Sequence, residues 1–220
     1  MIGTPRNALL VAAAALLACL GLGVLVSMDA TRAFDDGVSA AILAGHSSTL
    51  ARLAATWETI GDLVPWVLIS WLAALALFVS GRRWAALWFF AAITADGAAA
   101  LVKILFALPR PPGGDLLDLW GGPSYAYPSG HVARTVVLLG LLAWVALREV
   151  PRLRRPFVAP SIVLLVVVGV ALMGIARIGA GEHWPSDVLG AALLGVAWLA
   201  LVMWLDRRVR GTPEAATAAP

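Results

Sequence analysis

Charged residues and cysteine are both scarce in this sequence of 220 residues. Only 13% of the residues are charged, whereas 61% are hydrophobic and the mean hydropathy is +0.89. Soluble domains usually carry about a quarter charged residues, so this balance indicates that lipid is the main solvent of the fold. Cys19 is the only cysteine, which excludes an internal disulfide and a cysteine-based metal site.

A continuous basic face is also missing, although the net charge is +3 and the isoelectric point lies near 9.7. The arginines stand between apolar blocks, where they are typical of membrane topology rather than of nucleic-acid binding. We therefore expect membrane lipid as a partner and no nucleic acid.

Long apolar runs, by contrast, are abundant. A membrane-spanning helix needs about 20 mostly apolar residues, and six stretches qualify: 8–28, 60–80, 84–108, 131–147, 157–176 and 187–205. The first run is longer than a signal-peptide core and lacks a clear cleavage site, so we interpret it as a retained helix. The sequence predicts an all-α, polytopic membrane protein: a six-helix bundle forming one domain over 1–210, followed by a disordered tail over 211–220.

The basic residues predict the orientation of this bundle. If the N-terminus is cytoplasmic, ten of the sixteen basic residues fall inside: Arg6, Arg82, Arg83, Arg148, Arg152, Arg154, Arg155, Arg207, Arg208 and Arg210. We expect both termini in the cytoplasm, and the arginine-rich, alanine-rich composition suggests a bacterial inner membrane. Residues 29–59 would form an extracytoplasmic segment with an amphipathic helix on the membrane surface over 40–57. His46 would be a polar residue of that segment.

Three groups of chemically active residues lie on the predicted outer side. The first runs over 103–111 after the third span, the second over 128–131 before the fourth, and the third over 177–187 between the fifth and sixth. Ionisable residues are costly at a membrane, so each is a functional candidate.

The first and third groups supply three cations, Lys103, Arg110 and Arg177, that could converge on one anion. Guanidinium groups match phosphate oxygens, and an ammonium adds a compact charge. Ser129 and Gly130 stand where the fourth span begins, so free backbone N–H groups there would also bind an anion. Ser129 could serve as helix cap, as phosphate ligand, or as both.

Two histidines complete the pattern. His183 and Asp187 are four residues apart, which lets a carboxylate fix one ring nitrogen and leave the other free to attack. His131 would be a second imidazole across the anion. One histidine could then act as nucleophile while the other protonates the leaving oxygen, giving a phosphoryl transfer in two steps.

Together these groups resemble the three signature motifs of the type 2 phosphatidic acid phosphatase (lipid phosphate phosphatase) superfamily. The family patterns are Lys-x6-Arg-Pro, Pro-Ser-Gly-His and Ser-Arg-x5-His-x3-Asp. The matching positions here are Lys103, Arg110, Pro111, Pro128, Ser129, Gly130, His131, Arg177, His183 and Asp187. One position departs, because Ala176 stands where the family has serine, and one hydroxyl ligand is therefore missing. The resemblance implies six spans, an outward-facing site, a lipid phosphate substrate, and no cofactor or metal. It also implies His183 as nucleophile, Asp187 as its orienting partner and His131 as general acid.

Several other residues allow more than one interpretation. Asp96 lies on the Lys103 face of the third span, and Arg134 is its expected partner. We expect these two supporting residues to form a structural pair rather than to act in catalysis. We expect Glu182 to face water. The loop 113–127 contains leucines, Trp120, Tyr125 and Tyr127, and is either an interfacial aromatic belt or a lid beside the site.

The motifs recognise phosphate and leave the lipid open: polyprenyl phosphates or diphosphates, phosphatidylglycerol phosphate and phosphatidic acid all fit. A phosphotransferase with a hydroxyl acceptor is an enzymatic alternative. A non-catalytic lipid-phosphate-binding protein or transporter is a third, although no inverted repeat favours transport. A vanadium haloperoxidase shares the anion cradle, but the apolar spans argue against it. The sequence does not indicate an oligomeric state.

Overall fold

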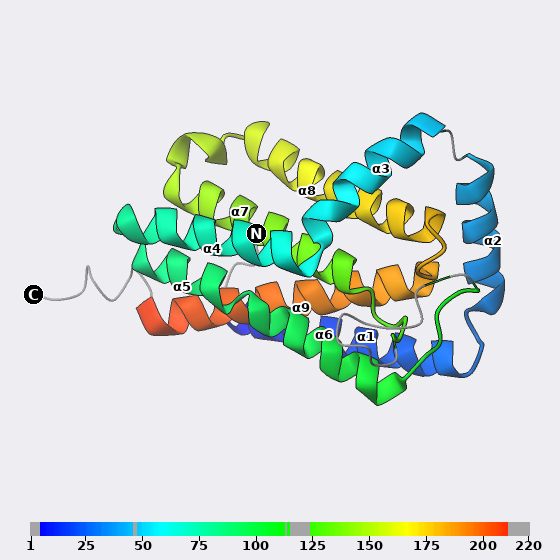
Figure 1. Cartoon of the computed structure of the whole chain (residues 1–220). Coiled ribbons are helices and arrows are strands. Elements are labelled where there is room, and N and C mark those ends of the chain that lie inside the picture. Colours follow the sequence, from blue (N-terminus) through cyan, green and yellow to red (C-terminus); the bar gives the residue numbers. More distant parts are fainter. Residues whose placement is uncertain (1–4, 46–47, 113, 115–123, 211–220) are drawn as a thin grey trace, which may run out of the picture.

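The computed structural model describes residues 5–45, 48–112, 114 and 124–210, and the regular structure of this part is helical throughout (Figure 1). In chain order the elements are α1 (Pro5–Ser27), α2 (Arg32–Ala44), α3 (Ser48–Gly61), α4 (Leu63–Val79), α5 (Arg83–Ala91), α6 (Ile93–Phe106), α7 (Gly130–Glu149), the 3₁₀ turn η1 (Pro151–Arg154), α8 (Val158–Gly179) and α9 (Pro185–Arg210). The predicted tail and His46 lie outside the described residues.

Five helical segments in this part of the chain are long and apolar enough to cross a membrane. They are Arg6–Ser27, the α5–α6 segment Arg83–Phe106, and α7, α8 and α9. Counting a bent pair made by α3 and α4 gives up to six, which confirms the all-α, polytopic fold. Apart from the second span, the predicted boundaries agree with the helix ends to within five residues.

The second predicted span, 60–80, is not one straight helix. It breaks at Asp62, and Leu53–Gly61 meets Leu63–Val79 at an angle of 64°. Asp62 has an extended backbone (φ −63°, ψ 147°) and precedes the first turn of α4. Pro65 stands in that turn, where its missing N–H costs no helical hydrogen bond. The bend places the end of α3 beside the start of α7.

The expected surface helix over 40–57 is also wrong in detail, because the described parts of this segment form two helices. α2 stands across one end of the bundle, and α3 runs back along α8 (Figure 1). The indole Nε1 of Trp57 donates to the carbonyl of Gly169 in α8 at 3.0 Å. Hence α3 is a packed member of the bundle rather than a helix lying freely on the bilayer.

A core of aromatic and aliphatic side chains joins α4, α5, α7 and α9; it includes Trp66, Phe89, Leu141 and Trp198. Other large apolar side chains point outward, for example Leu164 and Leu165 of α8, which are 62% and 69% exposed. Such outward apolar surface is what a lipid environment favours. At the end of the bundle beside α2, the end of α6 meets the starts of α7 and α9.

Candidate active site

The segment before α7 is fixed by one buried aromatic residue. Tyr127 is fully buried, and its hydroxyl donates to the carbonyl of Cys19 in α1 at 2.5 Å. Its ring lies against Gly190 of α9, where an added Cβ would come within 2.4 Å of the ring. Tyr127 is therefore an internal anchor, and for this residue neither the belt nor the lid interpretation holds. The leucines of this loop and Trp120 lie outside the described residues.

This anchor positions Ser129 and Gly130 at the N-terminus of α7. The backbone N–H of Ser129 donates to the carbonyl of Asp187 at 3.1 Å, which ties the start of α7 to the start of α9. Ser129 is fully buried, but its hydroxyl caps no backbone group and has no hydrogen-bond partner among the described residues. That hydroxyl remains available to an anion at the helix terminus.

His183 and Asp187 form the expected pair at the start of α9. Nδ1 of His183 lies 3.3 Å from Oδ2 of Asp187, and both side chains are 1% exposed. The same carboxylate oxygen accepts from the backbone N–H of Trp184 at 2.8 Å, so the carboxylate is held from two sides. This contact leaves Nε2 of His183 as the ring nitrogen free of Asp187.

A second acid, which we did not identify from the sequence, supports this turn from α2. The buried carboxylate of Asp35 accepts from the backbone N–H of Ser186 at 2.8 Å and from its hydroxyl at 2.9 Å. A carboxylate at the N-terminus of α9 also suits the helix dipole. Asp35 thus connects α2 to the residues that flank His183.

His131 stands in the first turn of α7 and faces the corner between α3 and α4. Its Nε2 lies 2.9 Å from Oδ1 of Asp62. Gly61 permits this close approach, because an added Cβ would come within 2.9 Å of the imidazole. The bend at Asp62 therefore supplies a partner for His131 that a straight span would not provide.

The three predicted cations gather around the same point, each with a different set of contacts. Nζ of Lys103 donates to the backbone carbonyls of Tyr125 and Ala126 at 2.5 and 3.3 Å. Nε of Arg110 donates to the hydroxyl of Ser124 at 2.8 Å. Arg177 pairs with Glu58 of α3 at 3.3 Å.

Glu182 joins the two arginines, which contradicts the expectation that it faces water. Its Oε2 lies 2.5 Å from Nη1 of Arg110 and 3.4 Å from Nη2 of Arg177, and its side chain is only 16% exposed. Its backbone carbonyl also accepts from Nη1 of Arg110 at 3.0 Å. A carboxylate therefore occupies a position between two guanidinium groups, beside the histidine pair.

The electrostatics of His183 reflect this convergence. Burial comes first, and the nearby charges of Lys103, Arg110 and Arg177 add to it; together they hold the pKa of His183 well below its ordinary value. A smaller contribution to this shift comes from His131. His183 is thus neutral and able to act as a nucleophile at physiological pH.

Three buried polar atoms of this cluster have no hydrogen-bond partner among the described residues: Ser129 Oγ, Arg177 Nε and Asp187 Oδ1. Buried polar atoms are rarely left unpaired. Two of the three, Ser129 Oγ and Arg177 Nε, can donate hydrogen bonds, and the cations Lys103 and Arg110 lie in the same cluster. This arrangement suits a small anion with many acceptor atoms, such as phosphate. Within the described ranges, no group of three or more His, Cys, Asp or Glu side chains is arranged to hold a metal.

The expected pairing of Asp96 with Arg134 is confirmed. Nε of Arg134 donates to Oδ1 of Asp96 at 2.7 Å, and Nη1 of Arg134 donates to the carbonyl of Gly61. The pair links α6, α7 and the end of α3 below the histidines. Ala176, at the family's serine position, is buried in α8 and offers no hydroxyl to the cluster.

Comparisons with known proteins match much of the chain to one protein family. The family model described as the PAP2 superfamily matches residues 84–210. Phosphatidylglycerophosphatase B of Bacillus subtilis is 27% identical over 96 residues, which cover 44% of this chain and 46% of that protein. Phosphatidylglycerophosphatase B of Escherichia coli is 36% identical over 96 residues, covering 41% and 34%. The matched part of the chain thus spans less than half the length of these curated relatives.

Two solved structures share the fold. A transmembrane PAP2-type phosphatidylglycerolphosphate phosphatase from Bacillus subtilis superposes with a TM-score of 0.74 at 21% identity, covering 90% of this chain and 96% of that one. LpxE of Aquifex aeolicus superposes with a TM-score of 0.54 at 20% identity, covering 77% and 94%. At these identities the likeness concerns the fold.

Proposed function

The chain belongs to the PAP2 superfamily, and we propose that it is a membrane phosphatase that hydrolyses a lipid phosphate or diphosphate. The observation that carries this proposal is the convergence of both histidines and three cations on one buried point with unpaired donors. The names of the curated relatives favour a glycerophospholipid phosphate, and a polyprenyl phosphate or diphosphate has the same reacting group.

In the first step, the substrate's phosphate displaces the Glu182 carboxylate from Arg110 and Arg177. Nε2 of His183 then attacks phosphorus, while Asp187 holds Nδ1 and stabilises the positive charge that develops on the ring. His131 takes up a proton as the anionic phosphate binds beside it. When the bond from phosphorus to the lipid oxygen breaks, His131 gives that proton to the oxygen. The lipid alcohol leaves, and a phosphohistidine remains.

In the second step, a water molecule attacks the phosphohistidine. His131, now deprotonated, takes the proton from this water, and the bond between phosphorus and Nε2 breaks. Inorganic phosphate leaves, and Glu182 returns to the arginines. Throughout, Lys103, Arg110, Arg177, the Ser129 hydroxyl and the backbone N–H of Gly130 stabilise the charge on the phosphoryl oxygens. The steps use only protein side chains, and we propose that they need no metal.

The site would face the outside of a bacterial inner membrane. The supporting observation is that Arg82, Arg83, Arg148 and Arg210 cluster at the opposite end of the bundle, as the positive-inside rule expects of a cytoplasmic face.

The test is phosphate release from a panel of lipid phosphates in detergent with EDTA present, comparing the wild type with His183→Ala. The panel contains phosphatidic acid, phosphatidylglycerol phosphate and polyprenyl mono- and diphosphates. We expect release by the wild type and a loss of at least about 10²–10⁴-fold in the variant. A folded wild type that releases no phosphate, but forms a phosphorylated acceptor when a hydroxyl acceptor is added, would be a phosphotransferase. Binding without release would identify a non-catalytic protein.

A further inference from the structure

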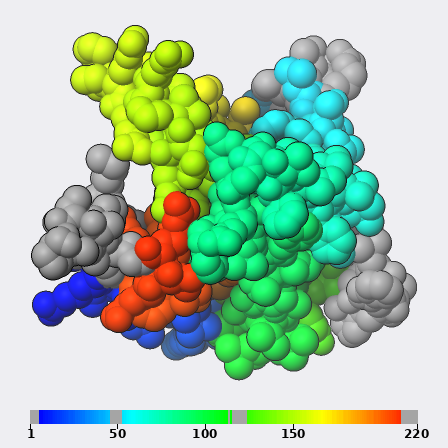
Figure 2. Space-filling model, turned by 90° about the vertical axis from the view of Figure 1, so that its left-hand side faces the viewer, coloured from blue at the N-terminus to red at the C-terminus, as the bar shows by residue number. Residues whose placement is uncertain are grey.

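A second charged cavity lies at the other end of the bundle. It has a volume of about 440 Å³ and is lined by Arg82, Arg83, Trp84, Glu149, Val209 and Arg210. These residues come from the α4–α5 turn, the start of α5 and the ends of α7 and α9. These segments lie at the end of the molecule that faces the viewer in Figure 2. Since α9 has 26 residues and rises about 1.5 Å per residue, its two ends are about 39 Å apart. The cavity is therefore separate from the histidine site at the start of α9.

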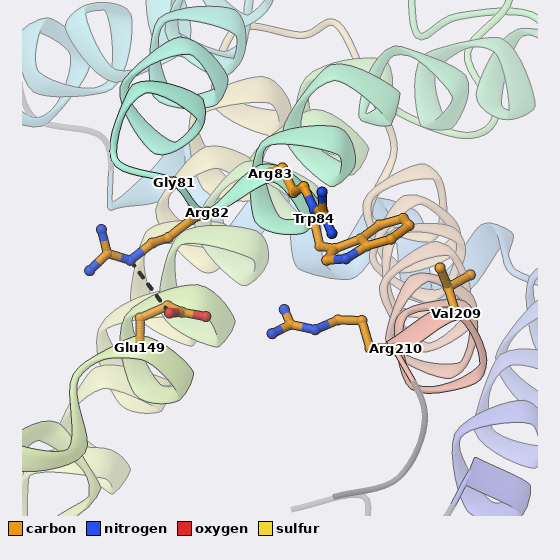
Figure 3. A pocket seen from close by; sticks show the side chains of 7 residues that line it. All are labelled: Gly81, Arg82, Arg83, Trp84, Glu149, Val209 and Arg210. Atoms are coloured by element: carbon orange, nitrogen blue, oxygen red, sulfur yellow. Dashed lines mark ion pairs between the residues drawn. The ribbon is translucent and has the colours of Figure 1, made fainter. Parts of the chain in front are cut away.

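Positive charge is in excess around this cavity. Arg82 pairs with Glu149 at 3.4 Å, whereas Arg210 extends from the end of α9 toward them (Figure 3). Within the described residues Arg210 pairs with Asp206, at 3.9 Å, but this carboxylate already accepts from Trp88 and from Arg148.

Arg83 has no ion pair in the described part of the chain, and its guanidinium lies 5.9 Å from the ring of Trp84. Among the described lining residues, the three positive charges of Arg82, Arg83 and Arg210 therefore exceed the one negative charge of Glu149 by two. The cavity can accept an anion with two negative charges before its own charge is balanced.

Exposed apolar side chains accompany the charged lining of this cavity. Val209, one of the lining residues, is 51% exposed. Phe78 and Val79 end α4 just before Gly81, which also lines the cavity, and they are 62% and 78% exposed. All three lie at the ends of helices that are apolar enough to cross a membrane, alone or as part of the bent pair. A cationic cavity next to exposed apolar side chains matches a molecule with an anionic head and hydrocarbon chains.

We propose that this cavity binds the phosphate of an anionic phospholipid headgroup from the membrane leaflet opposite the histidine site. The phosphate oxygens contact Arg83 and Arg210, the acyl chains follow Phe78 and Val209, and Trp84 lies at the interface. Free inorganic phosphate offers the same oxygens but has no hydrocarbon chains to contact the exposed side chains of Phe78 and Val209.

Other arginines at this end provide a control, because topology alone would place arginines there. Arg152 and Arg155 in and after η1 are exposed and are not among the lining residues of the cavity. A general attraction of the bilayer for positive charge would treat both pairs alike. Only a specific binding site in the cavity would make lipid binding depend more on Arg83 and Arg210 than on Arg152 and Arg155.

The experiment measures lipid binding to purified full-length protein in neutral detergent by native mass spectrometry and by thermal shift. The probes are phosphatidylglycerol, phosphatidylcholine and inorganic phosphate. The proteins are the wild type, Arg83→Ala/Arg210→Ala, and the charge-matched control Arg152→Ala/Arg155→Ala. Circular dichroism confirms that each variant is folded.

We expect the wild type and the control to bind phosphatidylglycerol in preference to phosphatidylcholine. The cavity variant should bind it at least about 100-fold more weakly, since each hydrogen bond between an arginine and a phosphate contributes about a factor of ten or more. Glu149→Gln, which removes an acid from the cavity, should bind it more tightly and so tests the site without removing an arginine.

Equal losses in the two double variants, or equal binding of the two lipids, would overturn the proposal. Arginine-dependent binding of inorganic phosphate with no preference for lipid would also overturn it, since the cavity would then be a site for a soluble anion. The histidine site is intact in every variant, so none of these outcomes depends on phosphatase activity.

Discussion

Replacing Glu182 with glutamine should increase the affinity of the site for phosphate. The carboxylate of Glu182 contacts Nη1 of Arg110 and Nη2 of Arg177, and a substrate phosphate needs both guanidinium groups. A hydrogen bond to a charged group contributes about 1.5–3 kcal/mol, against about 0.5–1.5 kcal/mol for a neutral one. Displacing glutamine should therefore cost about 1–2 kcal/mol less, which corresponds to about 5–30-fold tighter binding.

The assay is competitive inhibition of lipid phosphate hydrolysis by inorganic phosphate. The inhibition constant should fall by that factor in Glu182→Gln, and KM for the lipid phosphate should fall with it. Arg110 should stay in place, because the backbone carbonyl of residue 182 still accepts from Nη1. Asp29→Asn, at an exposed acid between α1 and α2 whose positive φ asparagine also adopts, is the matched control and should leave both constants unchanged.

An unchanged or higher inhibition constant in a folded Glu182→Gln protein would refute this reasoning. It would mean that the carboxylate holds the arginines in their binding positions rather than competing with phosphate.

Three other changes have expected outcomes. Asp96→Asn should lower the free energy of unfolding by about 2–3 kcal/mol, because it breaks the ion pair with Arg134. This loss is smaller than for a fully buried pair, since both side chains are partly exposed. A stable but inactive protein would contradict this expectation. Asp35→Ala leaves two buried donors of Ser186 unpaired, so thermal unfolding should show a free energy of unfolding lower by about 2–4 kcal/mol. Phosphate release should also fall. Wild-type stability of this variant would contradict the role of Asp35 in holding the start of α9. The low pKa of His183 means that the unfolded state binds more protons below pH about 6.5, so stability should fall on acidification by up to about 1.4 kcal/mol per pH unit. Melting temperatures between pH 7.5 and 5.5 should therefore fall more steeply for wild type than for His183→Gln, and parallel curves would contradict a buried neutral imidazole.

Features that depend on local sequence were predictable. The spans follow from apolar runs, and the pairing of His183 with Asp187 follows from a spacing of four residues near a helix start. The partner of Asp96 was also predictable, because an acid within a span needs a cation at a similar depth, and Arg134 was the nearest candidate.

The acids that complete the site were not predictable in this way. Asp35 and Glu58 act on residues more than 100 positions away, and neither lies in a motif or in an apolar span. Asp62 contacts His131 only because the second span bends, and the one local signal for that bend was an acid three residues before Pro65. Glu182 looked solvent-exposed because its neighbours are small; its contacts depend on how the end of α6 approaches α8.

Detection of the phosphohistidine itself tests the central claim most directly. Wild-type protein is mixed with a lipid phosphate substrate, quenched during turnover at alkaline pH, where a phosphohistidine survives, and digested for mass spectrometry. We expect one phosphoryl group on the peptide that contains His183, more of it in His131→Ala if slow hydrolysis lets the intermediate accumulate, and none in His183→Ala. A phosphoryl group on another residue, or hydrolysis that continues in His183→Ala, would contradict the assignment of His183 as the nucleophile.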